Sequence, residues 1–163
     1  MLRVVVGLLA LVAAGGPVSA EQWGTIVPGE STMQAVREQY GGPTRTSTTK
    51  TEGYDTAQWV YEGSQAPAGV VRLTIDFGLV SAGTFHAEIV RSFILEPKRG
   101  VFTRRTVTEG WGLPHGLGRE GDSEFYFYRE GLFVYFDKDG ENVLSMVFTP
   151  PQLPPPGKFG TPR

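Results

Sequence analysis

Two histidines and one acidic run are the side chains whose types could form a metal site. His86 and His115 are the only histidines, and neither has a second ligand type at metal-binding spacing. The acidic run at 137–141 begins like a calcium loop, but Asn142 and Phe148 stand where such a loop needs Gly and Glu. We therefore expect no bound metal.

The chain also lacks the signatures of nucleophilic and nucleotide chemistry. It has no G-x-S-x-G motif, and the glycine-rich stretch 110–118 has neither the spacing nor the preceding strand of a dinucleotide-binding loop. It has no cysteine, which excludes disulfides and thiolate metal ligands. We predict a protein that is not an enzyme and that holds no cofactor.

The aromatic residues of the 125–135 segment remain, and their chemistry is contact with another protein. Strand side chains alternate between two faces, so if Phe125 and Phe127 face a buried side, their neighbours lie on an open one. Large rigid rings on an open face are effective binding anchors. The predicted protein-binding residues are Tyr126, Tyr128, Phe133 and Tyr135.

An alternative for these rings is that they pack against the N-terminal arm, the proline-rich C-terminal segment or the other half of the chain. A slip of one residue in register would exchange the two faces.

An internal similarity indicates the elements that position these residues. Residues 103–114 (TRRTVTEGWGLP) match residues 32–43 (TMQAVREQYGGP), which stand 71 positions earlier. Each segment predicts a short helix with one apolar face, and Ser31 or Thr32 and then Thr103 as N-caps. A Gly ends each helix, and a Pro two residues later prevents its continuation.

Helices this short must lie on a larger surface, and alternating side chains predict that this surface is an antiparallel sheet. The predicted strands lie at 56–62, 70–77 and 85–93 after the first helix, and at 124–128, 132–136 and 143–148 after the second. Residues 44–54 are predicted to be a polar turn, and residues 110–118 a helix end with its loop. The predicted fold class is α+β, with two tandem repeats, each a short helix followed by about three antiparallel strands, and helices packed on one sheet face.

Predicted domain boundaries follow from these patterns. Residues 1–20 form a signal peptide with cleavage near Ala20, because their apolar run is too short to span a bilayer and ends in small residues. Residues 21–93 form the first repeat and residues 94–149 the second. Residues 150–163, with six of the twelve prolines, form a disordered tail.

Charge and export narrow the partners. The chain has 15 basic and 17 acidic residues and no basic stripe, so we expect no nucleic acid. No later segment is long enough to span a membrane. We expect a protein in the periplasm or outside the cell that binds a protein partner, and peripheral association with the outer membrane is the one membrane contact that this prediction allows.

The motif residues resemble a known family. The pattern I-x-P-G-x-S-T-x-x-x-V-x-x-x-Y-G-x-P at 26–43 and W-V-Y at 59–61 are similar to SmpA/OmlA (BamE-like) modules of bacterial outer-membrane assembly lipoproteins. Residues 136–143 (FDKDGENV) are similar to that family's later hairpin. The tandem arrangement also resembles secreted beta-lactamase inhibitory proteins, in which two repeats join their sheets into a concave binding surface. This chain lacks the lipidated Cys of the former and the disulfides of the latter.

Both resemblances imply a protein that works by contact with other proteins. We expect an exported protein-binding module, either an envelope adaptor or a protein related to outer-membrane assembly. One alternative is a secreted inhibitor of an enzyme such as a beta-lactamase or a protease. A further alternative is a small-molecule carrier or hydrolase, which would need a deep pocket with convergent polar groups.

Overall fold

The structure is a computed structural model that describes residues 24–151 of the chain. The predicted signal peptide at 1–20 and all but the first two residues of the predicted tail lie outside the described residues. Neither of the two α-helices in this range is long and apolar enough to cross a membrane.

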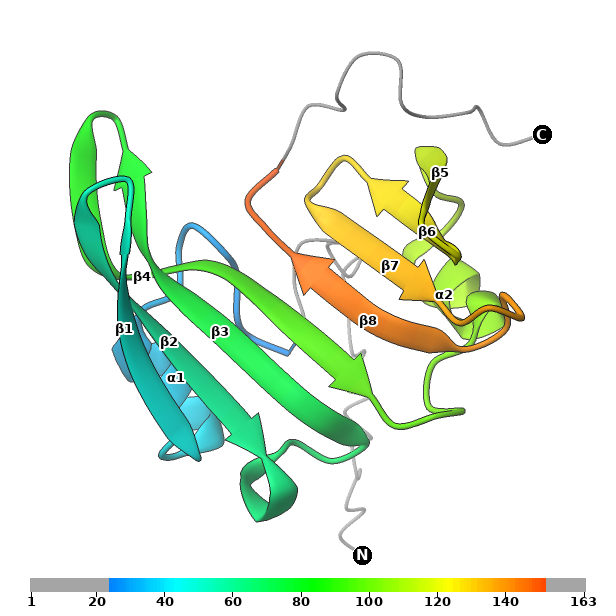
Figure 1. Ribbon diagram of the computed structural model, residues 1–163, viewed down its shortest axis with the longest axis horizontal. Helices are drawn as coiled ribbons and strands as arrows, with labels where there is room; N and C mark the ends of the chain where they lie inside the picture. The colour runs from blue at the N-terminus through cyan, green and yellow to red at the C-terminus, as the bar shows by residue number, and fades with distance from the viewer. Residues whose placement is uncertain (1–23, 152–163) are drawn as a thin grey trace, which may run out of the picture.

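One antiparallel sheet of eight strands forms the body of the protein (Figure 1). The strands are β1 (Arg45–Thr51), β2 (Tyr54–Glu62), β3 (Val70–Ser81), β4 (Thr84–Pro97), β5 (Gly116–Glu120), β6 (Ser123–Tyr128), β7 (Leu132–Phe136) and β8 (Val143–Phe148). Their order across the sheet is β1-β2-β3-β4-β8-β7-β6-β5. The two halves of the chain therefore meet where β4 pairs with β8.

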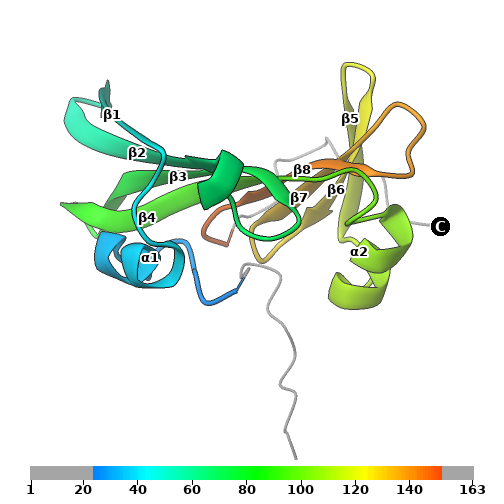
Figure 2. The ribbon, with the colours of Figure 1, turned by 90° about the horizontal axis from the view of Figure 1, so that it is seen from below.

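Helices α1 (Met33–Tyr40) and α2 (Arg104–Trp111) lie on the same side of this sheet, one beneath each half (Figure 2). A single 3-10 turn, η1 (Gly63–Gln65), follows β2. Val36 of α1 and Val107 of α2 are fully buried in one hydrophobic cluster that also takes side chains from both halves of the sheet. The core is therefore continuous from one half to the other.

The predicted α+β fold of two tandem repeats, each a short helix with about three strands, is wrong. Helical residues make up 15% and strand residues 53% of the structure, and all eight strands belong to one sheet. The physical reason is the pairing of β4 with β8, which turns two groups of strands into one surface. Phe93 and Phe148 stack across this seam with their ring centroids 4.4 Å apart.

The two strands that the sequence did not predict are β1 and β5, at the two edges of the sheet. The whole of β1 is polar and almost wholly exposed, and β5 contains two glycines. An edge strand that packs little against the core carries no alternation of apolar and polar residues. Strand β1 is held instead by its backbone pairing with β2, from Arg45 opposite Val60 to Thr51 opposite Tyr54.

The two helices begin and end at the residues that their capping pattern predicts. The Thr32 and Thr103 hydroxyls each accept a hydrogen bond at 3.2 Å from a backbone N–H of the first turn. Gly41 and Gly112 follow the last helical residues with φ of 75° and 80°, a conformation that L side chains rarely adopt.

A buried strand tyrosine fastens each helix end to the sheet. The Tyr61 hydroxyl donates to the Gly41 carbonyl at 3.1 Å, and the Tyr128 hydroxyl donates to the Gly112 carbonyl at 3.0 Å. Burial raises the pKa of both hydroxyls, so they remain protonated donors at neutral pH. Each such bond contributes about 1 kcal/mol.

The turn between β6 and β7 provides a test of this packing. Gly131 has φ of 99°, and a Cβ there would overlap the Thr149 carbonyl oxygen, whereas a Cβ on Gly83, with φ of 78°, would meet no atom within 4 Å. We expect Gly83→Ala to lower the free energy of unfolding by about 1–2 kcal/mol, the cost of the left-handed backbone. Gly131→Ala should add about 1–3 kcal/mol for the overlap. Urea denaturation of both variants measures this difference, and equal losses would contradict the packing described.

Candidate protein-binding face

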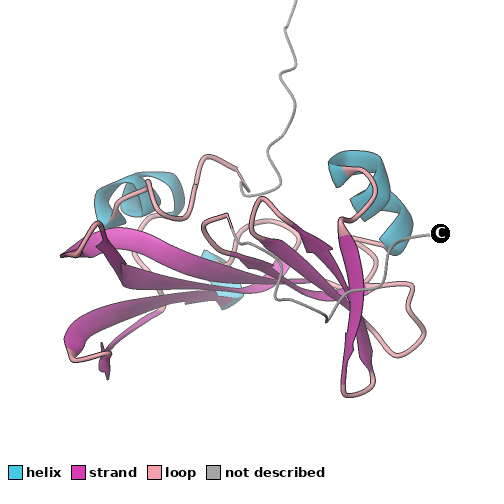
Figure 3. Cartoon of the chain, turned by 90° about the horizontal axis from the view of Figure 1, so that it is seen from above, coloured by secondary structure: helices cyan, strands magenta, loops and turns pink. Residues whose placement is uncertain are grey.

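The sheet has one face covered by helices and one open face. Both helices lie on the same side, and within residues 24–151 no helix covers the other side (Figures 2 and 3). The outer strands at both ends bend away from the helices, so the open face is concave (Figure 3).

The structure divides the four predicted binding residues between these faces. Tyr126 and Tyr128 stand opposite Val134 and Leu132, and they are only 8% and 1% exposed. They therefore lie in the core, and the prediction that they belong to the open face is wrong. Phe133 and Tyr135 are on the open face, each half-buried, and Phe125 lies on the same face opposite Tyr135.

Residues 125–128 of β6 are F-Y-F-Y, so both faces of this strand are aromatic. The alternation of side chains therefore does not show which face is buried. The polar partners lie on the helix side. The Tyr128 hydroxyl reaches the Gly112 carbonyl, and the Tyr126 hydroxyl accepts a hydrogen bond from Arg104 at 3.0 Å. The tyrosines turn inward because only there are their hydroxyls satisfied.

Five half-buried apolar side chains form a stripe on the open face, across β4, β8, β7 and β6. Ile94 stands opposite Val147, Val147 opposite Phe133, and Tyr135 opposite Phe125. Side chains of directly opposed residues share a face, as do residues two apart on one strand. The apolar stripe consists of Ile94, Phe125, Phe133, Tyr135 and Val147.

The aromatic rings of the apolar stripe support one another. The Phe125 ring centroid lies 5.3 Å from that of Tyr135 and 6.2 Å from that of Phe133. Phe127, which is 1% exposed, stands opposite Phe133 on the same face, and the two ring centroids are 5.0 Å apart. Rings packed this way have already lost much of their rotamer freedom, so contact with a partner costs them little further entropy.

Two residues of β5 define the outer boundary of the apolar stripe. The Phe125 ring lies directly over Gly118, where a Cβ would overlap it, so this edge strand needs a glycine there. The Tyr135 hydroxyl is hydrogen-bonded to Glu120, and burial together with this carboxylate raises the pKa of Tyr135.

A chain of charged side chains borders the other end of the apolar stripe. Glu62 pairs with Arg45 and with Arg72 at 3.1 Å each, and Arg72 also pairs with Glu96 at 3.5 Å. The hydrogen bond from Arg72 lowers the pKa of Glu62. Exposed pairs of this kind add little stability, but a polar rim around an apolar centre is typical of protein interfaces.

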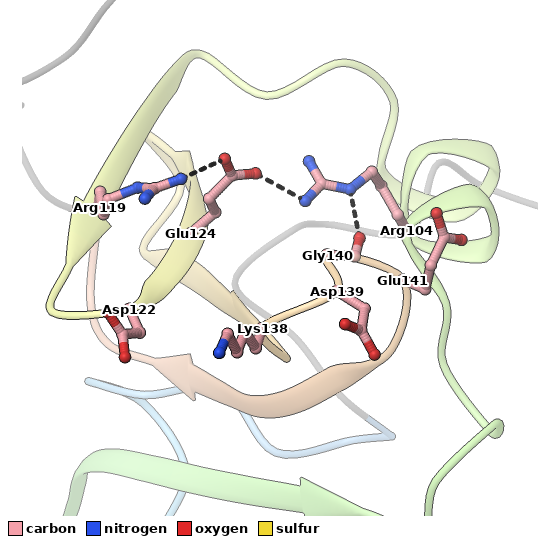
Figure 4. Close-up of a pocket in the computed structure, with 8 residues that line it drawn as sticks. All are labelled: Arg104, Arg119, Asp122, Glu124, Lys138, Asp139, Gly140 and Glu141. Atoms are coloured by element: carbon pink, nitrogen blue, oxygen red, sulfur yellow. Dashed lines mark hydrogen bonds and ion pairs between the residues drawn. The ribbon is translucent and has the colours of Figure 1, made fainter.

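A polar cavity of ≈ 360 Å³ lies beside α2 (Figure 4). It is lined by Arg104, Arg119, Asp122, Glu124, Lys138, Asp139, Gly140 and Glu141. Glu124 bridges Arg119 and Arg104 with hydrogen bonds of 3.0 Å each. The hydrogen bonds from Arg119 and Arg104 lower the pKa of Glu124.

Arg104 has a structural part in this cavity. Its Nε donates to the Gly140 carbonyl at 2.6 Å, and its guanidinium lies 4.3 Å from the Phe136 ring centroid and 5.0 Å from that of Tyr126. Its donors are thus engaged within the chain. Charges of both signs are mixed in the cavity, and among residues 24–151 no group of three His, Asp or Glu could hold a metal ion. The apolar stripe is therefore the stronger candidate site.

Asp137, the first residue of the acidic run at 137–141, stabilises the turn between β7 and β8 through its carboxylate. The Asp137 carboxylate accepts hydrogen bonds from the backbone N–H of Glu141 at 3.0 Å and of Asn142 at 3.1 Å. It also accepts from the Asn142 side chain at 2.8 Å. These bonds, those from Asn142 most of all, lower the pKa of Asp137.

The lowered pKa of Asp137 predicts a dependence of stability on pH. Its contribution is complete above the unfolded-state pKa, near pH 4, and is lost as pH falls through the lower folded-state pKa. We expect Asp137→Asn to lower the urea midpoint at pH 7 and to flatten its decline below about pH 4. Asp139→Asn, in the same turn and exposed, is the control; equal effects of both changes would contradict this assignment.

A substitution at Gly118 tests the contact between β5 and the Phe125 ring of the apolar stripe. Gly118→Ala should displace the Phe125 ring, with a loss of about 1–3 kcal/mol at most because the half-exposed ring can move. We expect changed aromatic NMR signals for Phe125 and Tyr135, with unchanged signals for Tyr128 on the opposite face. Gly42→Ala, where an added Cβ meets nothing within 4 Å, should change none of them. Unshifted Phe125 signals in Gly118→Ala would refute the contact.

Comparison with protein-family models, curated proteins and solved structures finds no match to this chain. The resemblance to SmpA/OmlA modules therefore stays a prediction from the motif residues.

Proposed function

We propose that this protein binds another protein through the open face of its sheet, with the apolar stripe at the centre of the contact. The observation that carries the proposal is five half-buried apolar side chains, three of them aromatic, on a concave face that no described helix covers. Contiguous apolar patches of this kind with a polar rim mark interaction sites.

Composition and rigidity of the face support the proposal. Aromatic residues are enriched where binding energy concentrates, and Phe125, Phe133 and Tyr135 stand together at one end of the apolar stripe. The charged pairs around Arg72 surround the apolar centre as an interface rim does. The strands below are paired on both sides, so the surface needs no rearrangement before contact.

The setting of this activity is part of the same proposal. The pattern of residues 1–20 favours export, and the resemblance to SmpA/OmlA modules favours the bacterial envelope. On this basis the protein is an envelope adaptor, and its partner is another exported or outer-membrane protein.

The test is recovery of partners from an envelope extract on immobilised full-length protein. We expect Phe133→Ser to reduce recovery more than tenfold, because truncating a central anchor costs about 2 kcal/mol or more. Leu113→Ser removes an apolar side chain that is 79% exposed in the loop after α2, so it should leave recovery unchanged.

Both variants must first give the wild-type circular dichroism spectrum and urea midpoint. Equal recovery by wild type, Phe133→Ser and Leu113→Ser would show that the apolar stripe is not the contact. Equal loss in both variants would point to general stickiness rather than a specific face.

A further inference from the structure

We propose that the apolar stripe docks residues 152–163 of the same chain, so that this segment and an external partner compete for one surface. The inference concerns regulation of the proposed binding site and rests on the stripe being a docking surface. Its four supports are the point where the chain leaves the sheet, the reach of the segment, its chemistry and its charge.

The chain leaves the sheet beside the apolar stripe. Val147 stands opposite Phe133, and Phe148 stands opposite Leu132. The Thr149 backbone N–H then donates to the Gly131 carbonyl at 2.8 Å. Thr149 is therefore two positions beyond the stripe residue Val147, and the following residues start next to the stripe.

The reach of the segment is sufficient. An extended proline-rich chain advances about 3 Å per residue, so residues 152–159 can span on the order of 25 Å. Along β7, Phe133 and Tyr135 are about 7 and 13 Å from Gly131 at about 3.3 Å per residue. Both large apolar residues of the segment, Leu153 and Phe159, can reach the stripe without any change in the described strands.

The chemistry of the segment matches that of the surface. Residues 154–156 are consecutive prolines between Leu153 and Phe159. Proline runs favour the polyproline II conformation, and aromatic surfaces bind it because it is already extended and loses little entropy. The aromatic rings of Phe125, Phe133 and Tyr135 form such a surface.

Charge also matches. Lys158 and Arg163 are the charged side chains of the segment, and both are positive. On the open face, Asp76 is hydrogen-bonded to Gln58 at 2.9 Å and to Ser92 at 3.4 Å, and Glu120 is bonded to Tyr135. Within the described range neither carboxylate forms an ion pair with a cation, so each can attract a basic residue.

A spin label tests the docking in the full chain. The protein has no cysteine, so Thr161→Cys gives a single site for a nitroxide. We expect the NMR signals of Phe133, Tyr135 and Val147 to broaden, and those of Val36 and Val107, on the helix side, to stay sharp. Phe159→Ser in the labelled chain should abolish the broadening, while Gln152→Ser should preserve it.

Sharp signals along the whole apolar stripe, or broadening of the helix side instead, would overturn the proposal. A mixture of labelled, isotope-free chains with unlabelled, isotope-enriched chains identifies the source. Broadening that is equally strong in this mixture would mean that a second copy's segment occupies the stripe, which would also overturn it.

Partner recovery tests the binding proposal independently of the docking. If docking is correct, Phe159→Ser should raise recovery severalfold while Gln152→Ser leaves it unchanged. Broadening without any recovered partner would defeat the proposed function and leave the docking standing. Recovery that depends on Phe133 without broadening would do the reverse.

Discussion

The pairing of β4 with β8 is the contact on which the rest of the structure depends. It consists of three residue pairs, Phe93 with Phe148, Ile94 with Val147, and Leu95 with Met146. Because strand side chains alternate, the first and third pairs are buried in the core while the second points to the open face. One short seam therefore makes the core continuous and also begins the apolar stripe.

Hydroxyl groups decide which aromatic residues face inward. In most half-exposed strands the polar side chain faces water, but in β6 the tyrosines are buried and Phe125 is half-exposed. The buried side offers the Gly112 carbonyl at the end of α2 and the Arg104 guanidinium, and each satisfies one hydroxyl. Helix α2 thus determines, through these two bonds, which rings remain for contact on the opposite face.

The face proposed for binding is not the face that fastens the helices to the sheet. Residues that fasten helices to the sheet, such as Tyr61 and Tyr128, lie on the covered side, where their loss would weaken the fold. Residues of the apolar stripe are half-buried, and the rings of Phe125, Phe133 and Tyr135 lie against one another. A change such as Phe133→Ser therefore removes contact area with less damage to the core than a change on the other face.

The sequence alone predicted the ends of both helices, with Ser31 or Thr32 before the first, Thr103 before the second, and Gly41 and Gly112 after them. It also predicted the position of strands whose side chains alternate in burial, such as β3. Capping and alternation depend on neighbours within a few residues, so they can be read along the chain. Edge strands β1 and β5, the seam between β4 and β8, and the face on which Tyr126 and Phe125 lie were decided only by the tertiary structure. The seam and the orientation of Tyr126 depend on partners distant in sequence, β8 for β4 and Arg104 for Tyr126. The edge strands β1 and β5 pair with their neighbours in the chain, β2 and β6, but as edge strands they lack the alternation that would identify them.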